Sequence, residues 1–308
     1  MASWIEVSLT ADGEAAEAFA HDIYERCHQG VVIEPADLEP GVWDEGDVPP
    51  PARMTVRGYF ADDDHAQATQ EYMLKLLAYI DMLHPQSKAQ LAFRYVHDED
   101  WADAWKAHYR PIRLGKRILV RPRWVEITSQ PSDIVISLDP GMAFGTGTHP
   151  STQLCLEALE ELVQPGMDVL DLGCGSGILA IGAALLGARR VLALDIDPLA
   201  VEATVENAHE NGVADRIIAQ EGSLETVLTS ARRFDLVVVN ILAKVIASLC
   251  RSGLAQTVRP GGRAIFSGVL ESQADELGIV FRETGLQVVG QRQMGDWVLI
   301  EAVRSSES

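Results

Sequence analysis

The pattern of hydrophobic and polar positions changes along the chain and divides it into parts. The first ninety-odd residues consist of short segments that either alternate between apolar and polar positions or repeat apolar residues at helical spacing. Strands are predicted over residues 4–9, 31–33, 54–60 and 91–96, and helices over residues 13–27 and 64–81. The order β-α-β-β-α-β predicts an α+β, ferredoxin-like domain over residues 1–96. Because this fold supports many functions and the segment contains no catalytic motif, it is typical of a recognition domain.

Aromatic side chains recur at three- and four-residue steps in the next segment, at Trp101, Trp105, His108 and Tyr109. This spacing predicts a connecting helix with a buried stripe, and we place the linker helix at residues 97–116. The alternative is an aromatic cage for a cation. Such a cage needs rings on three sides, which one helix stripe does not provide.

From residue 117 onward, strands and helices alternate, and we place a second domain at residues 117–308. Strands are predicted over residues 117–124, 134–138, 168–172, 190–194, 217–220, 236–239, 264–267, 286–289 and 297–302, and helices over residues 178–186, 198–211 and 244–252. Continuous apolar runs such as Leu236-Val237-Val238-Val239 are typical of parallel strands that are buried on both faces. The sequence therefore predicts an α/β domain with a doubly wound, mostly parallel sheet.

The end of the chain breaks this alternation. The loop between the last two predicted strands is too short for a crossover helix and requires an antiparallel pair. Residues 259–263, Arg-Pro-Gly-Gly-Arg, are predicted to form a turn before the fifth strand. A seven-stranded sheet that ends in an antiparallel hairpin resembles the class I methyltransferase fold.

A glycine-rich segment, Asp171-Leu172-Gly173-Cys174-Gly175-Ser176-Gly177, leaves one predicted strand and opens a helix. Glycines at this point permit a tight turn and a close approach of a ligand to the backbone. Asp195 lies at the end of the next strand, where a carboxylate can accept hydrogen bonds from both hydroxyls of a ribose. Gly173, Gly175 and Asp195 are therefore predicted to bind a cofactor.

Two cofactors compete for this motif. A nicotinamide dinucleotide site has the spacing G-x-G-x-x-G, which would require a glycine at Ile178, and its pyrophosphate needs a helix N-terminus that binds negative charge. S-adenosylmethionine has no phosphate and carries a positive sulfonium, which suits the acidic Asp171. A glycine turn without a ligand is disfavoured, because Gly175, Asp195 and Asn240 all follow strand ends, where doubly wound sheets bind ligands. The motif therefore favours S-adenosylmethionine.

Asn240-Ile241-Leu242-Ala243 follows the fourth strand of the predicted sheet. Many amino-group methyltransferases have Asn or Asp, two prolines and an aromatic residue here, and the Asn and the next backbone carbonyl accept hydrogen bonds from the target nitrogen. We predict that Asn240 and the carbonyl of Ile241 or Leu242 are catalytic. The missing aromatic residue disfavours a nucleobase target and favours a flexible alkyl amine. The alternative is that Asn240 only caps the following helix.

The segment 139–152 precedes the first helix of this domain and is rich in glycine and threonine. It predicts a loop that folds over a bound ligand, in which Phe144 covers the cofactor while Thr148 and Thr152 offer hydroxyl groups. His149 has two interpretations. It acts as a base or, as is more usual for an isolated histidine, makes a structural hydrogen bond.

The composition limits the partners and the compartment. The 308 residues include 25 Lys and Arg against 45 Asp and Glu, for a formal net charge of −20. This charge disfavours direct nucleic-acid recognition and suits a basic protein partner, although acidity also simply keeps a protein soluble. The four cysteines form no Cys-x-x-Cys pair, and no Cys/His cluster has zinc spacing, so we expect no metal site. Since no signal-like N-terminus or long apolar run occurs, we expect a cytoplasmic protein with no membrane contact.

The chain resembles the ribosomal protein L-eleven methyltransferase family over nearly its whole length. The resemblance rests on residues 144–152, 171–177, 194–198 and 240–243, and on the linker around Trp101 and Trp105. It implies methyl transfer from S-adenosylmethionine to lysine side chains and the N-terminal amine of large-subunit ribosomal protein eleven, which the N-terminal domain docks. It also implies cofactor contacts at Thr152, Gly173, Asp195 and Asn240, and Ile196 completes the expected site.

Three other functions stay open. An RNA methyltransferase is disfavoured by the net charge and by the missing aromatic residue after Asn240. A non-catalytic factor that binds the ribosomal protein and keeps only a cofactor pocket is disfavoured because both Asp195 and Asn240 are present. A dinucleotide-dependent oxidoreductase is disfavoured by the glycine spacing and would bind NADH.

Overall fold

The computed structural model describes residues 3–23, 26–36, 53–97, 111–138, 147 and 149–305. The chain divides into two compact units, Met1–Arg110 and Pro111–Ser308. Phe144, Thr148 and most of the predicted linker helix lie outside the described residues. The last part of that predicted helix, residues 112–114, instead forms a short strand.

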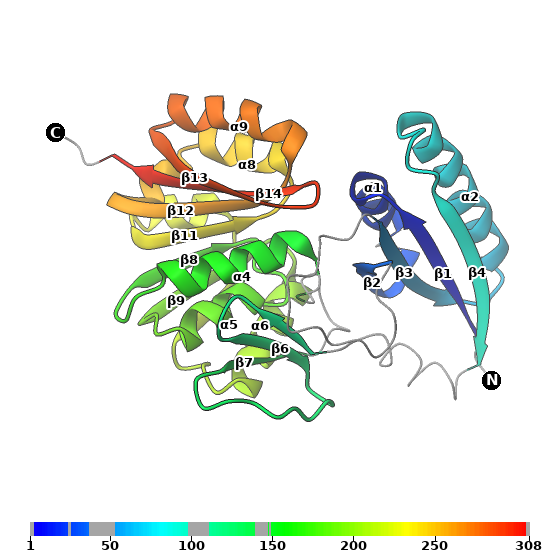
Figure 1. Cartoon of the computed structure of the whole chain (residues 1–308), viewed down its shortest axis with the longest axis horizontal. Coiled ribbons are helices and arrows are strands. Elements are labelled where there is room, and N and C mark those ends of the chain that lie inside the picture. The colour runs from blue at the N-terminus through cyan, green and yellow to red at the C-terminus, as the bar shows by residue number, and fades with distance from the viewer. Residues whose placement is uncertain are drawn as a thin grey trace. The chain divides into compact units, whose positions relative to one another are not determined.

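The N-terminal unit has the predicted order of elements. It contains β1 (Ser3–Ala11), α1 (Gly13–Ile23), β2 (His28–Pro35), β3 (Met54–Ala61), α2 (Ala66–Leu83) and β4 (Gln90–His97). The strands form one antiparallel sheet in the order β2-β3-β1-β4 (Figure 1). The α+β, ferredoxin-like architecture expected from the sequence is therefore confirmed.

The two faces of this sheet differ because side chains alternate along each strand. Ile5 and Leu9 of β1 are buried in an apolar cluster with both helices. On the opposite face, the buried Glu6 accepts hydrogen bonds from Tyr59 and Arg94, each 2.8 Å long. Burial alone would raise the pKa of Glu6, but these bonds and the charge of Arg94 hold it below its usual value. A charged cluster thus stabilises the face that the helices leave open.

The C-terminal unit is built around a seven-stranded sheet in the order β10-β9-β8-β11-β12-β14-β13. Its strands are β8 (Asp168–Leu172), β9 (Arg190–Asp195), β10 (Ile217–Glu221), β11 (Phe234–Asn240), β12 (Val258–Leu270), β13 (Leu286–Met294) and β14 (Trp297–Arg304). The first five run parallel, and β14 runs antiparallel to both of its neighbours. The predicted doubly wound sheet with an antiparallel last hairpin is therefore confirmed.

Helices cover both faces of this sheet, with α4 and α5 on one side and α8 and α9 on the other (Figure 1). The helices are α4 (Pro150–Leu162), α5 (Ile178–Leu185), α6 (Pro198–Glu210), α7 (Leu224–Thr229), α8 (Ala243–Arg251) and α9 (Glu271–Glu283). Alternation along β11 sends Val238 into one apolar cluster and Val237 into the other, which explains its continuous apolar run. In the described part of the chain, no helix has the length and apolar character needed to cross a membrane.

A separate three-stranded sheet contains β5 (Ile112–Leu114), β6 (Ile118–Pro122) and β7 (Ile134–Leu138). The sequence pattern predicts β6 and β7 but misses β5, which has only three residues. Ile118, Val120 and Ile136 are buried in the cluster that contains α4 and α5. The small sheet therefore packs on this helix layer and extends the core of the unit.

Strand β12 is irregular at two places. Residues 259–263 lie inside this strand, and its pairing with β11 skips from Val258 to Arg263. Within this described strand, residues 259–262 do not pair with β11 and bulge out between Val258 and Arg263, so the predicted turn lies inside β12 and not before it. The second irregularity lies between Phe266 and Val269 in the pairing with β14. Bulges of this kind bend a strand and are common next to active sites.

Candidate active site

Three neighbouring strands end at or next to the residues that the sequence predicts for the cofactor and the substrate amine. In the sheet, β8 lies between β9 and β11. The glycine motif follows β8, Asp195 is the last residue of β9, and Asn240 is the last residue of β11. Because these strands are parallel, their carboxyl ends meet at one edge of the sheet. The structure therefore brings the glycine motif, Asp195 and Asn240 to the same edge.

The glycine motif forms a tight loop across the end of β9. Gly173, Gly175 and Gly177 have positive φ angles of 83°, 52° and 79°, which residues with a Cβ rarely adopt. The backbone amides of Gly173 and Cys174 donate to the Leu194 carbonyl oxygen at 2.8 and 3.0 Å. These bonds hold the loop on β9, and the glycines allow a ligand to approach its backbone closely.

Two backbone amides orient the Asp195 carboxylate. The Gly175 N–H donates to Oδ2 at 2.9 Å, and the Asp197 N–H donates to Oδ1 at 3.1 Å. Each carboxylate oxygen can accept more than one hydrogen bond, so Asp195 can still accept from the two hydroxyls of a ribose. The neighbouring Ile196 is 77% exposed and presents an apolar surface that a planar base could cover.

Two polar residues of α6, not identified from the sequence, hold the glycine motif. Thr204 Oγ1 donates to the Gly175 carbonyl at 2.9 Å, and Asn207 Nδ2 donates to the Ser176 carbonyl at 2.9 Å. A Cβ on Gly177 would lie 2.8 Å from Thr204 Cγ2, so the loop packs directly on the helix. Both polar residues lie on the buried face of α6, among its buried alanines. A polar residue at a buried helix position is the signal that could have identified them from the sequence.

Asp171 is a buried carboxyl group at the start of the glycine motif. Only 1% of its surface is exposed, and its Oδ2 atom accepts from the Ala180 N–H at 3.0 Å. Among the described residues, Oδ1 has no hydrogen-bond partner. Burial raises the pKa of Asp171 to about 7; the Ala180 bond opposes this shift, and the charge of Asp195 adds to it. A positive group bound near Asp171 would favour its ionised form.

Asn240 contacts the first turn of α4. Its Nδ2 atom donates to Thr152 Oγ1 at 3.3 Å, and Thr152 is fully buried. Since this bond uses the donor side of the amide, Oδ1 is the side that can accept a hydrogen bond from an amine. Asn240 does not cap α8, because Leu242 occupies the N-cap position of that helix.

The carbonyl groups that follow Asn240 differ in their availability. The Leu242 carbonyl oxygen accepts from the Val245 and Ile246 amides at 2.9 and 3.1 Å, and so belongs to the first turn of α8. The Ile241 carbonyl precedes the helix. Of the two carbonyls considered from the sequence, that of Ile241 therefore fits the role of an amine acceptor better than that of Leu242.

His149 is the N-cap residue of α4. Its Nδ1 atom accepts from the Ser151 N–H at 3.2 Å and lies 2.7 Å from Ser151 Oγ. The ring packs edge-on against Trp297, with 4.6 Å between centroids, and burial lowers the pKa of His149 to about 4. Burial thus makes His149 a weak base and its Nδ1 atom already caps α4, so the geometry supports the structural interpretation over that of a base.

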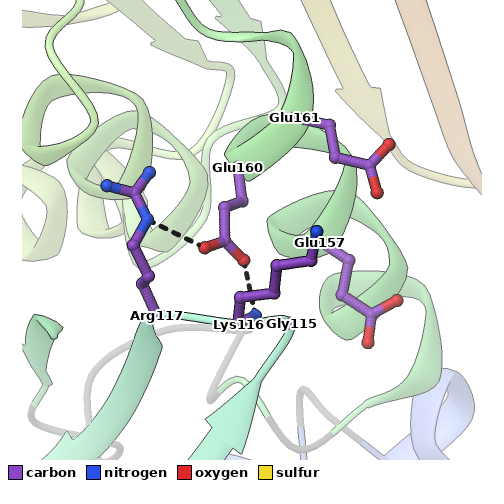
Figure 2. A pocket seen from close by; sticks show the side chains of 6 residues that line it. All are labelled: Gly115, Lys116, Arg117, Glu157, Glu160 and Glu161. Carbon is purple, nitrogen blue, oxygen red and sulfur yellow. Dashed lines mark hydrogen bonds and ion pairs between the residues drawn. The ribbon is translucent and has the colours of Figure 1, made fainter. Parts of the chain in front are cut away.

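A cavity of about 380 Å³ lies away from these residues. Figure 2 shows its lining, which comes from the β5–β6 turn and the C-terminal half of α4: Gly115, Lys116, Arg117, Glu157, Glu160 and Glu161. Glu160 accepts from the Lys116 amide at 2.7 Å and from Arg117 Nε at 3.1 Å. Glu160 is about 12 Å along the helix axis from Thr152, at 1.5 Å per residue. No residue predicted for the cofactor lines this cavity, so we do not place the active site there.

Comparison with known proteins identifies the family. A family described as "Ribosomal protein L11 methyltransferase (PrmA)" matches residues 3–305. Two proteins named ribosomal protein L11 methyltransferase, from Desulfitobacterium hafniense and Chloroflexus aurantiacus, are 40% and 39% identical to this chain, and each alignment covers 97% of both chains. The crystal structure of a ribosomal protein L11 methylase from Lactobacillus delbrueckii subsp. bulgaricus has a TM-score of 0.59 and 35% identity, and covers 64% of this chain and 100% of that chain.

These matches agree with the fold and with the arrangement of the strand ends. The family match extends from β1 to the last residues of β14, so it includes both units. The family resemblance predicted from the sequence is confirmed, and the chain belongs to the ribosomal protein L11 methyltransferase family.

Proposed function

We propose that this protein transfers methyl groups from S-adenosylmethionine to lysine side-chain and N-terminal amines of ribosomal protein L11. The observation that carries the proposal is the common sheet edge shared by the glycine motif, Asp195 and Asn240. The names of the relatives supply the substrate, and the net charge of −20 suits a basic protein. The cytoplasm, where ribosomal proteins are made, is the corresponding location.

The residues at this edge fit S-adenosylmethionine. The Asp195 carboxylate would accept hydrogen bonds from the ribose hydroxyls, and the exposed Ile196 would contact the adenine. The buried Asp171 at the start of the glycine loop suits a ligand with positive charge. When bound, this cofactor supplies an electrophilic methyl group on its sulfonium. Phe144 and Thr148 stay predicted cofactor contacts.

The amine must be neutral before it can attack the methyl group. A lysine has a reference pKa of about 10.4, and removal from water next to a positive charge lowers that value. We assign Asn240 Oδ1 and the Ile241 carbonyl oxygen as acceptors for the two N–H groups of the neutral amine. These two hydrogen bonds would point the lone pair of the amine at the methyl group that the bound cofactor supplies. Catalysis comes mainly from this alignment.

The N-terminal unit is proposed to hold the substrate. It has its own apolar core, and none of the residues predicted for the cofactor lies in it. A recognition domain at residues 1–96, a linker at 97–116 and a catalytic domain at 117–308 are therefore part of this proposal. A linker would let one docked substrate present several amines in turn.

Mass spectrometry tests this function, with purified ribosomal protein L11 incubated with the protein and S-adenosylmethionine. Mass gains in steps of one methyl group on lysines or the N-terminus are expected. Asn240→Ala should lower turnover at least about 100-fold because the amine is no longer aligned, with less than about threefold change in the cofactor Kd by calorimetry. Asn240→Asp keeps an acceptor oxygen and should retain more turnover.

Equal losses of turnover and cofactor affinity in Asn240→Ala would remove Asn240 from the catalytic step. Cofactor binding without any methylation of ribosomal protein L11 would refute the substrate. Methyl transfer to ribosomal RNA in a parallel incubation would favour the RNA methyltransferase alternative, and tight NADH binding would favour the oxidoreductase.

A further inference from the structure

Strand β12 has a bulge at Ser267 and Gly268. Two residues of β12 lie between paired positions where β14 has only one. Ser267 Oγ donates to the Val298 carbonyl oxygen at 3.1 Å, which fixes the bulge on β14. Gly268 has a φ angle of 75°, so the bulge uses a conformation that favours glycine.

This bulge brings Gly268 against the backbone of Ile241. A Cβ on Gly268 would lie 2.5 Å from the Ile241 carbonyl oxygen, 2.9 Å from its carbonyl carbon and 3.1 Å from its nitrogen. On the other side, a Cβ on Gly173 would lie 2.6 Å from Ile241 Cγ2. Ile241 is therefore confined between Gly268 of β12 and Gly173, the first residue after β8, and these two strands flank β11.

The Ile241 peptide lies between the end of β11 and the first turn of α8. Asn240 forms the last pair of the β11–β12 ladder, with Ser267. The Leu242 carbonyl already belongs to the first turn of α8. Between them, the Ile241 carbonyl group lies so close to Gly268 that a Cβ there would clash with it.

We propose that Gly268 is a positioning residue that fixes the Ile241 carbonyl oxygen where it accepts an N–H of the substrate amine. This inference rests on the proposed amine methylation. A residue with a Cβ at position 268 would push the Ile241 peptide out of place. Displacement of an aligning group by about 1 Å can lower a rate about 100-fold.

The test compares Gly268→Ala with Gly261→Ala. Both glycines lie in β12 and have a φ of 75°, but a Cβ on Gly261 would meet nothing within 4 Å. Both variants therefore place an alanine at the same unfavourable φ, and only Gly268→Ala brings a Cβ against Ile241. We expect the kcat for methylation of ribosomal protein L11 to fall about 100-fold in Gly268→Ala, and to stay within about threefold of wild type in Gly261→Ala.

A binding measurement separates this inference from the identity of the substrate. Sinefungin carries an amine where S-adenosylmethionine carries its methyl group, whereas S-adenosylhomocysteine has no group there. The amine of sinefungin should donate to the Ile241 carbonyl oxygen. In Gly268→Ala, we expect the Kd of sinefungin to rise about tenfold relative to that of S-adenosylhomocysteine, as the loss of one charged hydrogen bond implies. Gly261→Ala should leave this ratio unchanged.

Equal effects of the two alanine variants, or equal losses of both ligands in Gly268→Ala, would overturn the inference. Wild-type protein that does not methylate ribosomal protein L11 would refute the proposed function, and the ratio of the two Kd values would still decide the role of Gly268. If Gly268→Ala does not fold, a crystal structure of the wild-type protein with sinefungin tests whether the Ile241 carbonyl oxygen accepts a hydrogen bond from the amine. An amine nitrogen about 3 Å from the Ile241 oxygen is expected, and an amine bonded only to other groups overturns the inference.

Discussion

Asp171→Asn should change how the free energy of unfolding depends on pH. Asp171 has a pKa of about 7 in the folded protein because it is buried, against the ordinary value of 3.8 for an unfolded chain. Between these values, folding takes up a proton. Asp171 therefore stabilises the fold fully only below about pH 3.8, and this contribution is lost as the pH rises through about 7. Asparagine can still accept from the Ala180 N–H but cannot ionise.

The magnitude follows from the two pKa values of Asp171. Each unit of difference is worth roughly 1.4 kcal/mol, so the full range amounts to about 4 kcal/mol. The isoelectric point of about 4.7 makes the acidic end of this range unsuitable for measurement. From about pH 5.5 to about pH 8, the wild-type protein should lose about 2 kcal/mol relative to Asp171→Asn.

Urea denaturation of both proteins across that pH range, followed by tryptophan fluorescence, measures this difference. Subtraction of the two unfolding free energies cancels the titration of all groups that the proteins share. A shift of about 2 kcal/mol in favour of the variant is expected as the pH rises. A difference that stays constant with pH would show that Asp171 ionises normally, and would refute the argument from burial.

Two further variants test the helix cap and the cofactor site. His149→Asn keeps a capping side chain but removes a buried ring whose pKa burial lowers from 6.5 to about 4. As the pH falls from about 7 to about 5, the unfolded wild-type chain takes up a proton at His149 that the folded protein does not. The free energy of unfolding of the wild-type protein should therefore fall by about 2 kcal/mol relative to that of the variant in the same denaturation assay. An equal fall in both proteins would contradict this. Asp195→Ala should raise the Kd of S-adenosylmethionine about 100-fold in calorimetry, because charged hydrogen bonds to the ribose are lost. An unchanged Kd would remove Asp195 from the site.

The fold was predictable where the local pattern and the burial agree. The apolar run of β11 indicates burial on both faces, and the short loop before Trp297 requires the antiparallel hairpin. Strand β5 was not predictable, because three residues have too little periodicity to distinguish a strand from a loop. Residues 259–263 have the composition of a turn, and they lie inside β12 only because Val258 and Arg263 on either side pair with a strand remote in sequence.

The candidate site was predictable to the level of the strand ends. Gly173 and Asp195 are separated by a single helix and strand, so their spacing is a local property. Which carbonyl after Asn240 is available depends on the residue where α8 begins, and the pattern around Leu242 does not define that start. The close approach of Gly268 to Ile241 brings β12 against the residue that follows β11, 27 positions earlier in the chain, and a glycine in a strand has several meanings in a sequence.

The position of β14 in the sheet affects when the active-site edge can be completed during synthesis. β14 is made after β13 but lies between β13 and β12. Until β14 has been translated, β12 has an unpaired edge and β13 has no strand to join, an arrangement prone to wrong pairing. The bulge at Gly268 is held by Val298 of β14, so the neighbourhood of Ile241 is finished last. A nascent chain that already contains the glycine loop and Asp195 would thus lack the restraint on the amine-accepting peptide, and its alignment would be acquired only when the final hairpin has folded.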